Sequence, residues 1–311
     1  MYKYIIFSVS ILLFVACETD SDIVLNNSQS YVLTSFIYPD SDVVANVYKS
    51  VTYNDAADYA CIGNANVKFS VNGELHSIAT LSDGATSVTF ANSGLKGGDK
   101  VSVELMDKDL TTLCNATTTI LEPIKIDSIS TYKQMVGIEA MTKFVIAFTD
   151  PTETTDYYQL KIRYHEKLPD GTDIIRTPEC DFYDYLFYIA RSTYNVTNSL
   201  MPSGVFTDEF INGRKVNISV RISQNELAPQ YENSELILEF LLFRHTSEYY
   251  NFLLTSYMIS EYLILRVFGI ATIYTNVENG VGLVSGMSYS SYKINVDRNK
   301  LGYKPILKNY E

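Results

Sequence analysis

Short segments in which apolar and polar residues alternate follow one another through the first third of the chain. In VKFSVNGELHSIAT, Val67, Phe69 and Val71 share one face, and Asn72-Gly73 then supplies the turn that a tight β-hairpin requires. About seven such segments occupy residues 31–123, and none has a helical period. This pattern predicts an N-terminal β-sandwich domain of immunoglobulin-like or transthyretin-like type.

Residues 124–311 predict a second, β-rich domain that begins after Glu122-Pro123. KFVIAFTD and DYYQLKIRYHE are typical of strands, and the apolar run ELILEFLLF predicts a strand buried on both faces. EFINGRKVNISVRIS predicts a hairpin that turns at Asn212-Gly213. The expected fold is therefore mainly β in both parts.

One segment of the second domain has a different period. HTSEYYNFLLTSYMISEYLILRVFG contains no proline and ends in Gly269. Thr246 or Ser247 is suited to cap a helix there, and Glu248 would lie in the first turn, where the helix dipole favours an acid. The sequence predicts one long helix at about residues 247–265.

The N-terminus predicts a lipid anchor. The apolar run Tyr4–Ala16 follows Lys3 and is shorter than the roughly 20 residues that a membrane-spanning helix needs. Ala16 is small and Cys17 follows it, as in a bacterial lipoprotein signal that is cut before a lipidated cysteine. Residues 1–16 are thus predicted to be a lipoprotein signal peptide with Cys17 as the lipidation site. The alternative is a cysteine that ends the signal by chance.

Acidic residues follow Cys17, and residues 17–30 predict a lipidated, acidic tether. Glu18, Asp20 and Asp22 resemble the acidic export signal of surface lipoproteins in Bacteroidota, although a solvated tether would have the same composition. We expect a protein anchored to the outer membrane and exposed at the cell surface. Its net charge of −12 would repel phosphate backbones, which argues against nucleic acid as a partner.

Three further cysteines remain, Cys61, Cys114 and Cys180. Export permits disulfides, and Cys61 and Cys114 fall in the same predicted domain, so they form the better candidate pair. The alternative is three small buried thiols. No CxxC spacing is present, which argues against a thiol-based metal site.

No motif predicts catalysis, a metal or a cofactor, so we expect a non-enzymatic protein. The chain has three histidines, His76, His165 and His245, none with a ligand partner three or four residues on, and we expect each to be solvated or satisfied. Two acidic groups lack the spacing of an EF-hand loop and predict solvated loops, with calcium left open. These groups are Asp150, Glu153 and Asp156, and Glu179, Asp181 and Asp184.

Tyrosines are frequent in the second domain. Residues 180–204 have no clear period and predict a long loop. Tyrosine supplies rigid contact area at binding surfaces, so we expect this loop to contribute one, unless its rings fill the core. The candidate residues are Tyr183, Tyr185, Tyr188 and Tyr194.

The stretch ATIYTNVENGVGLVSGMS at 271–288 resembles the C-terminal signature of a Bacteroidota lipoprotein family known as domain of unknown function 4249. Residues 47–56, 117–130 and 246–253 resemble the family in the same order, so the resemblance covers nearly the whole mature chain. Asn279-Gly280 suits a tight turn, and Gly282 allows close approach of another backbone. We expect a structural turn, with a ligand loop as the alternative.

The resemblance also implies a function. Members of that family are often encoded beside TonB-dependent outer-membrane transporters, which implies a surface accessory that binds nutrients for uptake. The alternative is a fimbrillin-like structural adhesin subunit, which would exchange a strand between copies. The C-terminal stretch YKINVDRNKLGYKPILKNYE is long enough for such a strand. Neither hypothesis identifies the ligand or the transporter partner.

Overall fold

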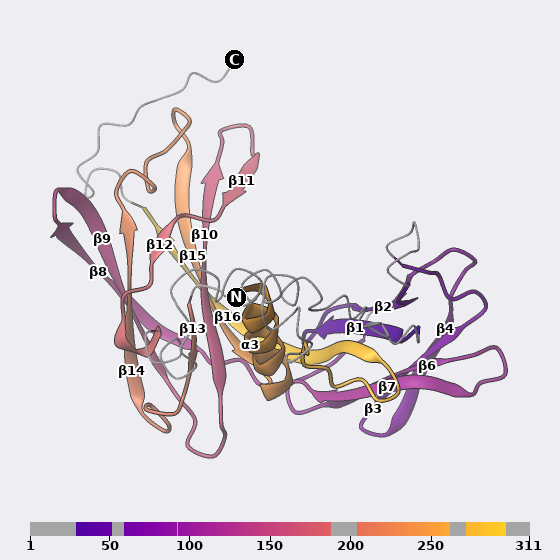
Figure 1. Ribbon diagram of the computed structural model, residues 1–311. Helices are drawn as coiled ribbons and strands as arrows, with labels where there is room; N and C mark the ends of the chain where they lie inside the picture. The colour runs from indigo at the N-terminus through magenta and orange to yellow at the C-terminus, as the bar shows by residue number, and fades with distance from the viewer. Residues whose placement is uncertain (1–28, 52–58, 92, 188–203, 262–271, 297–311) are drawn as a thin grey trace, which may run out of the picture.

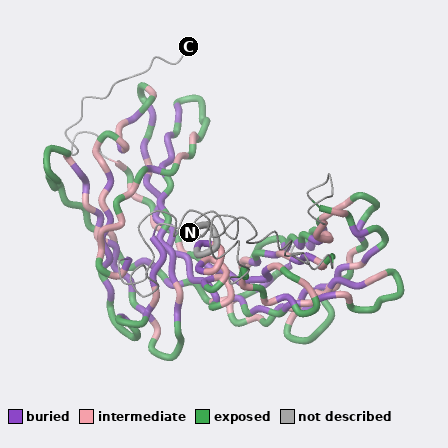
Figure 2. Tube along the Cα trace, in the orientation of Figure 1, coloured by how far each residue is buried: buried purple, intermediate pink, exposed green. Residues whose placement is uncertain are grey.

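The computed structural model describes residues 29–51, 59–91, 93–187, 204–261 and 272–296. The fold is mainly β, as predicted, and forms two lobes that lie side by side (Figure 1). Buried residues gather along the strands, between the facing sheets of each lobe (Figure 2). Among the described residues, no helix is both long and apolar enough to span a membrane.

The first lobe contains the seven strands expected between residues 31 and 123. They are β1 (Tyr31–Ile37), β2 (Val43–Lys49), β3 (Asn66–Val71), β4 (Glu74–Thr80), β5 (Ser87–Phe90), β6 (Lys100–Met106) and β7 (Thr112–Thr119). One sheet has the order β4-β3-β6-β7, and β1, β2 and β5 belong to the other. The predicted hairpin at Asn72-Gly73 is confirmed, with φ of 53° and 84°. Val67, Phe69 and Leu33 are fully buried between the two sheets.

The second lobe is also a pair of sheets. Its strands are β8 (Ile126–Val136), β9 (Glu139–Thr149), β10 (Tyr157–Lys167), β11 (Asp173–Arg176), β12 (Cys180–Asp181), β13 (Val205–Thr207), β14 (Lys215–Ser223), β15 (Glu235–His245) and β16 (Val281–Asn295). The order β12-β14-β9-β8 faces a sheet built on β10, β15 and β16. β15 is buried on both faces, as predicted. Phe144, Tyr158 and Phe240 fill the core between the sheets.

Strand β16 belongs to both lobes. Its first half pairs in parallel with β1, from Val32 opposite Val281 to Ile37 opposite Gly286. Its second half pairs antiparallel with β15, beginning with Met287 opposite His245. One eight-stranded sheet, β11-β10-β15-β16-β1-β2-β5 with β13 on β10, therefore runs through both lobes (Figure 1).

The sharing of β16 changes how the two expected domains are composed. Val277 and Val284 belong to the core of the first lobe, although they lie far beyond residue 124 in the sequence. The division at residues 123–124 stays a prediction. A boundary there separates the residues of the two lobes only as far as β15, because β16 returns to pair with β1 in the first lobe.

The long helix is α3 (Ser247–Glu261), which begins where the sequence predicts, and residues 262–265 of the predicted helix lie outside the described residues. The Thr246 carbonyl accepts a hydrogen bond from the Tyr250 N–H at 3.2 Å, so Thr246 precedes the first turn. Its hydroxyl lies 3.0 Å from that of Ser285 on β16. The helix is thereby joined to the strand that both lobes share.

The hairpin predicted at residues 209–223 is wrong. β14 is a strand, but it pairs with β9, whereas the preceding strand β13 pairs with β10 in the other sheet. The chain turns at Asn212-Gly213 inside an irregular loop, because the Asp208 carbonyl accepts hydrogen bonds from the N–H groups of Ile211 and Asn212.

Candidate functional site

The C-terminal signature forms the close packing expected of it. Asn279 has φ of 57°, as a tight turn requires, and Gly282 has φ of 124°. A Cβ on Gly282 would lie 2.1 Å from the Leu33 carbonyl oxygen, and one on Gly280 would lie 2.8 Å from that of Tyr31. Only glycine lets β16 approach β1 this closely. These residues therefore position the shared strand.

Asn276 also helps to position β16, and the sequence analysis did not identify this residue. Its side-chain amide donates to the Val284 carbonyl at 2.8 Å, and its amide oxygen accepts from the Val284 N–H at 3.0 Å. The side chain thus mimics a neighbouring strand. The Gly286 N–H donates to the Thr118 hydroxyl at 2.8 Å, which ties β16 to β7.

The tyrosine-rich stretch is divided between surface and core. Tyr185 is exposed, and Tyr183 is partly buried under the Arg221 guanidinium, 3.8 Å from its ring centroid. Phe187 is buried in the core of the second lobe. Tyr188 and Tyr194 lie outside the described residues. A binding surface at Tyr183 and Tyr185 stays a prediction.

The disulfide expected between Cys61 and Cys114 is not formed, and Cys61, Cys114 and Cys180 all carry free thiols. Cys61 is exposed and its thiol donates to the Gly84 carbonyl, whereas Cys114 faces the core of the first lobe. Burial raises the pKa of the Cys114 thiol to about 11. The two side chains are in different environments, which is why sharing a domain did not make them a pair.

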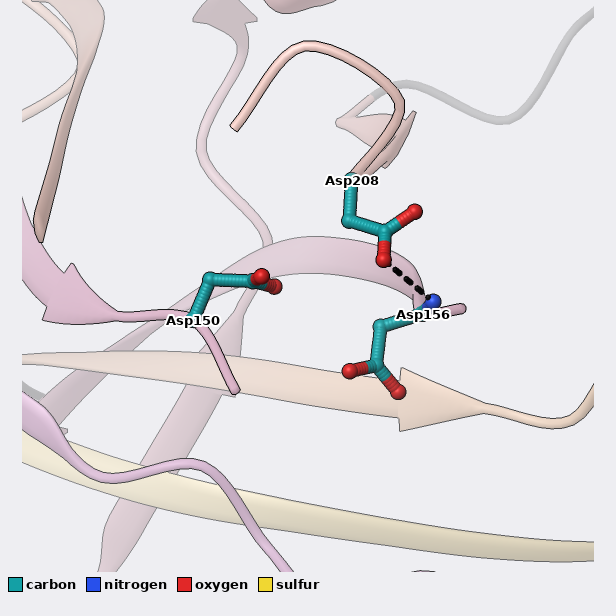
Figure 3. A group of neighbouring side chains, drawn as sticks. All are labelled: Asp150, Asp156 and Asp208. Carbon is teal, nitrogen blue, oxygen red and sulfur yellow. Dashed lines mark hydrogen bonds between the residues drawn. The ribbon is translucent and has the colours of Figure 1, made fainter. Parts of the chain in front are cut away.

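Three aspartates meet where the loops at one end of the second lobe converge. Asp150, Asp156 and Asp208 are buried, and one carboxylate oxygen of each lies within 4.8 Å of the others (Figure 3). The solvated loop expected for Asp150 and Asp156 is therefore wrong, although Glu153 is exposed. Asp208 lies too far away in the sequence for any local pattern to have included it.

Protein groups already bind most of these carboxylate oxygens. Asp150 accepts from the Tyr158 hydroxyl at 2.6 Å and from the Gly213 N–H at 2.9 Å. Asp156 forms an ion pair with Arg244, whose Nε lies 2.6 Å from its carboxylate, and Asp208 accepts from the Asp156 N–H at 2.9 Å (Figure 3).

The positive charge of the Arg244 guanidinium beside Asp156 disfavours binding of a metal cation. Burial raises the pKa of both Asp150 and Asp208, which favours their neutral forms over the carboxylates that would bind a metal. The cluster therefore acts as a structural tie. Arg244 also donates to the Glu122 carbonyl at 3.1 Å, which holds the linker between the lobes.

A cluster of six aromatic rings lies on the face of the shared sheet that points away from both cores. We call it the six-ring cluster. In spatial order it consists of Phe36, Tyr249, His245, Phe243, Tyr289 and Tyr38. Successive centroids are 5.9, 4.4, 5.8, 5.1 and 6.0 Å apart. Phe36 is 44% exposed and Tyr289 is 46% exposed, so the cluster presents aromatic surface to solvent.

The six-ring cluster depends on four parts of the chain. Phe36 and Tyr38 come from β1 and the residue after it, Phe243 and His245 from β15, Tyr289 from β16, and Tyr249 from the first turn of α3. The strand register brings Phe243 opposite Tyr289. Sequence analysis did not find this cluster, since its members are singly unremarkable aromatic residues on separate elements.

His245 corrects the expectation that every histidine is solvated or satisfied. His165 is satisfied, with its two nitrogens 3.1 Å from carboxylates of Asp173 and Glu239. His245 is 2% exposed, and within the part of the chain that the structure describes neither ring nitrogen has a hydrogen-bonding partner. Burial, followed by the nearby charge of Lys161, lowers the pKa of His245 to about 3. Its imidazole is therefore neutral at physiological pH.

A comparison with protein families matches most of the chain. The model of the family described as Domain of unknown function (DUF4249) matches residues 17–293. No curated protein matches the chain.

The solved structures that are similar to this chain include two with low TM-scores. A two fibronectin type-III domain segment from chicken tenascin is 10% identical, covers 86% of this chain and 100% of its own, and has a TM-score of 0.22. The BSP domain of a biofilm associated protein is 10% identical, covers 86% of this chain and 59% of its own, and has a TM-score of 0.18.

Proposed function

The chain belongs to the family described as Domain of unknown function (DUF4249), and on this premise we propose that it is a lipid-anchored, surface-exposed outer-membrane protein that binds a ligand or partner without catalysing a reaction. The short apolar run before Cys17 supports the anchor. One acyl chain holds a protein only marginally, so the several chains of a lipidated cysteine are needed for a stable anchor.

The six-ring cluster is the observation that carries the binding function. Monomeric proteins seldom expose contiguous apolar surface without a use for it. Tyrosine and other aromatic residues dominate binding energy where contact desolvates them. Here Phe36 and Tyr289 are nearly half exposed, although they contact Tyr249 and Tyr38 respectively. The cluster is also held rigidly, since three of its rings lie on the paired strands β15 and β16.

The partner that we propose is a TonB-dependent transporter, with nutrient capture as the shared task. The family resemblance supports this partner. The structure contributes an accessible aromatic surface on a sheet that joins both lobes.

The experiment is purification of the affinity-tagged protein from outer membranes, followed by identification of what is retained with it. We expect a transporter in stoichiometric amount, and its loss when Phe36 and Tyr289 are both replaced by alanine. Tyr132→Ala is the matched control, because Tyr132 is 57% exposed on β8. Thermal melting of each variant shows whether the fold is intact.

Three outcomes would contradict the proposal. Ladders of the chain itself would support the fimbrillin-like alternative. Retention of the transporter by the double variant would remove the six-ring cluster from the interface. A Cys17→Ala variant that is still processed and still sediments with membranes would refute the lipid anchor.

A further inference from the structure

We propose that the six-ring cluster is a binding site for a small anion that carries a planar ring, with Lys161 and Arg163 holding the anionic group and His245 hydrogen-bonding the ring-bearing part. The inference deepens the proposed function, on which it rests for the use of this surface. Three observations carry it: the local charge, the shape of the surface and the state of His245.

The charge beside the six-ring cluster is opposite in sign to that of the whole chain, whose net charge is −12. Glu239 is shared by two cations, with Arg163 at 3.9 Å and Lys293 at 3.4 Å. Lys161 forms no ion pair with any acid among the described residues, and its ammonium lies 4.9 Å from the centroid of the Phe243 ring. A second acid, Glu179, lines the cleft beside Lys161 and Arg163. Among these residues the three cations, Lys161, Arg163 and Lys293, therefore outnumber the two carboxylates, Glu239 and Glu179.

The lowered pKa of Lys161 agrees with this excess of positive charge. Loss of solvent around the ammonium, followed by repulsion from Arg163, lowers the pKa of Lys161 below its ordinary value. A bound anion would offset both effects, because an opposite charge favours the protonated amine. The cation over the Phe243 face also marks where a charged group and a ring surface meet.

The surface has room for a small ligand. Lys161 and Arg163 line a cleft of about 490 Å³ together with Gln159. Its other wall is formed by residues 177–180 and Phe182. This volume falls within the roughly 300–1,000 Å³ typical of small-molecule sites. The cluster meets this cleft at Lys161, whose ammonium lies 4.9 Å from the Phe243 ring centroid, although no ring of the cluster lines the cleft itself. A ligand bound there would therefore place its ring against the cluster and its charge in the cleft.

His245 supplies the third observation. A buried polar group without a partner destabilises a fold, so each instance calls for an explanation. The Tyr249 ring covers the imidazole at 4.4 Å between centroids and is itself only partly buried. When the Tyr249 side chain turns away, the neutral imidazole offers one donor and one acceptor to a ligand. Ligand binding is the explanation that we infer.

The test uses the mature full chain with indole-3-acetate as the probe and neutral indole-3-acetamide as its matched control. The chain contains no tryptophan, so the indole fluorescence of the probe can be excited at wavelengths where the tyrosines do not absorb, and no protein indole contributes to it. We expect saturable binding of the acetate that is at least about tenfold tighter than that of the amide, as a charge-assisted hydrogen bond predicts.

Single substitutions separate the contribution of Lys161 to probe affinity from that of His245. Lys161→Met should abolish the preference for the acetate and leave the amide unchanged, whereas Lys133→Met on β8 should change neither. His245→Phe should weaken both probes by about tenfold while raising the melting temperature, since it removes unpaired buried nitrogens. A residue with a merely structural role would not lower affinity while raising stability.

Absence of saturable binding of the acetate up to about 10 mM would overturn the inference, as would equal affinity for the two probes. So would unchanged affinity in both Lys161→Met and His245→Phe. The two proposals fail separately. A co-purified transporter without probe binding would leave the proposed function standing, and probe binding without a transporter would leave only the ligand site.

Discussion

Replacing Gly286 with alanine tests whether β16 is the element that holds the two lobes together. Gly286 is the last residue of β16 that pairs with β1, and the next residue, Met287, pairs with β15. An alanine Cβ would lie 2.1 Å from the Thr119 carbonyl oxygen, 2.7 Å from the Thr119 carbonyl carbon and 3.0 Å from the Ile120 Cα. These are backbone atoms at the end of β7, so no side chain can rotate to make room.

The expected loss can be assembled from separate effects. Overpacking typically costs about 1–3 kcal/mol. Moving β16 away would also weaken the hydrogen bond from the Gly286 N–H to the Thr118 hydroxyl, worth about 1 kcal/mol. Alanine restricts the unfolded chain, which offsets about 0.4–1 kcal/mol. The net prediction is a loss of about 2 kcal/mol in the free energy of unfolding.

Urea unfolding followed by circular dichroism measures this loss. With an m-value of about 3 kcal/mol per molar, the midpoint should fall by roughly 0.7 M. Gly63→Ala is the control, because its Cβ would meet nothing closer than the Asp83 carboxylate at 3.7 Å. We expect that control to stay within about 0.5 kcal/mol of the wild type. A Gly286→Ala midpoint equal to that of the control would refute the reasoning.

Three further predictions concern buried groups. Asp156→Asn should lower the free energy of unfolding by about 3 kcal/mol, measured by chemical denaturation, because it breaks the buried ion pair with Arg244. Asp208→Asn keeps an acceptor for the Asp156 N–H, so it should lower that free energy little at neutral pH. Equal losses in the two variants would contradict the assigned roles. Burial lowers the pKa of His245 to about 3, so the unfolded chain binds the proton first and stability is lost as pH falls below the ordinary value of about 6.5. Between pH 7 and 5 His245→Phe should therefore lose about 2 kcal/mol less than the wild type, and parallel pH profiles would count against this. The Cys61 thiol should react with a maleimide in the native protein, whereas Cys114 should react only after unfolding. Mass spectrometry of the labelled chain would show which cysteine has reacted. If neither thiol reacts until a reductant is added, the two form a disulfide.

The sequence by itself determined the features that depend on neighbours along the chain. Alternation of apolar and polar residues predicted the seven strands of the first lobe, and Asn72-Gly73 predicted their hairpin turn. The change of period after His245 predicted the start of α3. Burial of β15 on both faces followed from its continuous apolar run. Each of these features is encoded within about ten residues, because side-chain periodicity is a local property of the backbone.

The predicted hairpin at residues 209–223 shows where local reasoning ends. Asn212-Gly213 does turn the chain, but the strands on either side join different sheets. Asp208 and Asp150 hold this loop through hydrogen bonds to residues distant in the sequence. A turn motif specifies a change of direction and does not specify which strand each arm will pair with.

Only the tertiary structure decided how the lobes are joined and where the candidate site lies. Val32 pairs with Val281, and no periodicity relates two residues so far apart. Gly282 of the signature could be identified as a point of close approach, but the backbone that approaches it, that of Leu33, could not. The six-ring cluster and the three buried aspartates are likewise assembled from several elements. Such groups form because folding brings distant side chains together, and their chemistry comes from that proximity and from the loss of water that accompanies it.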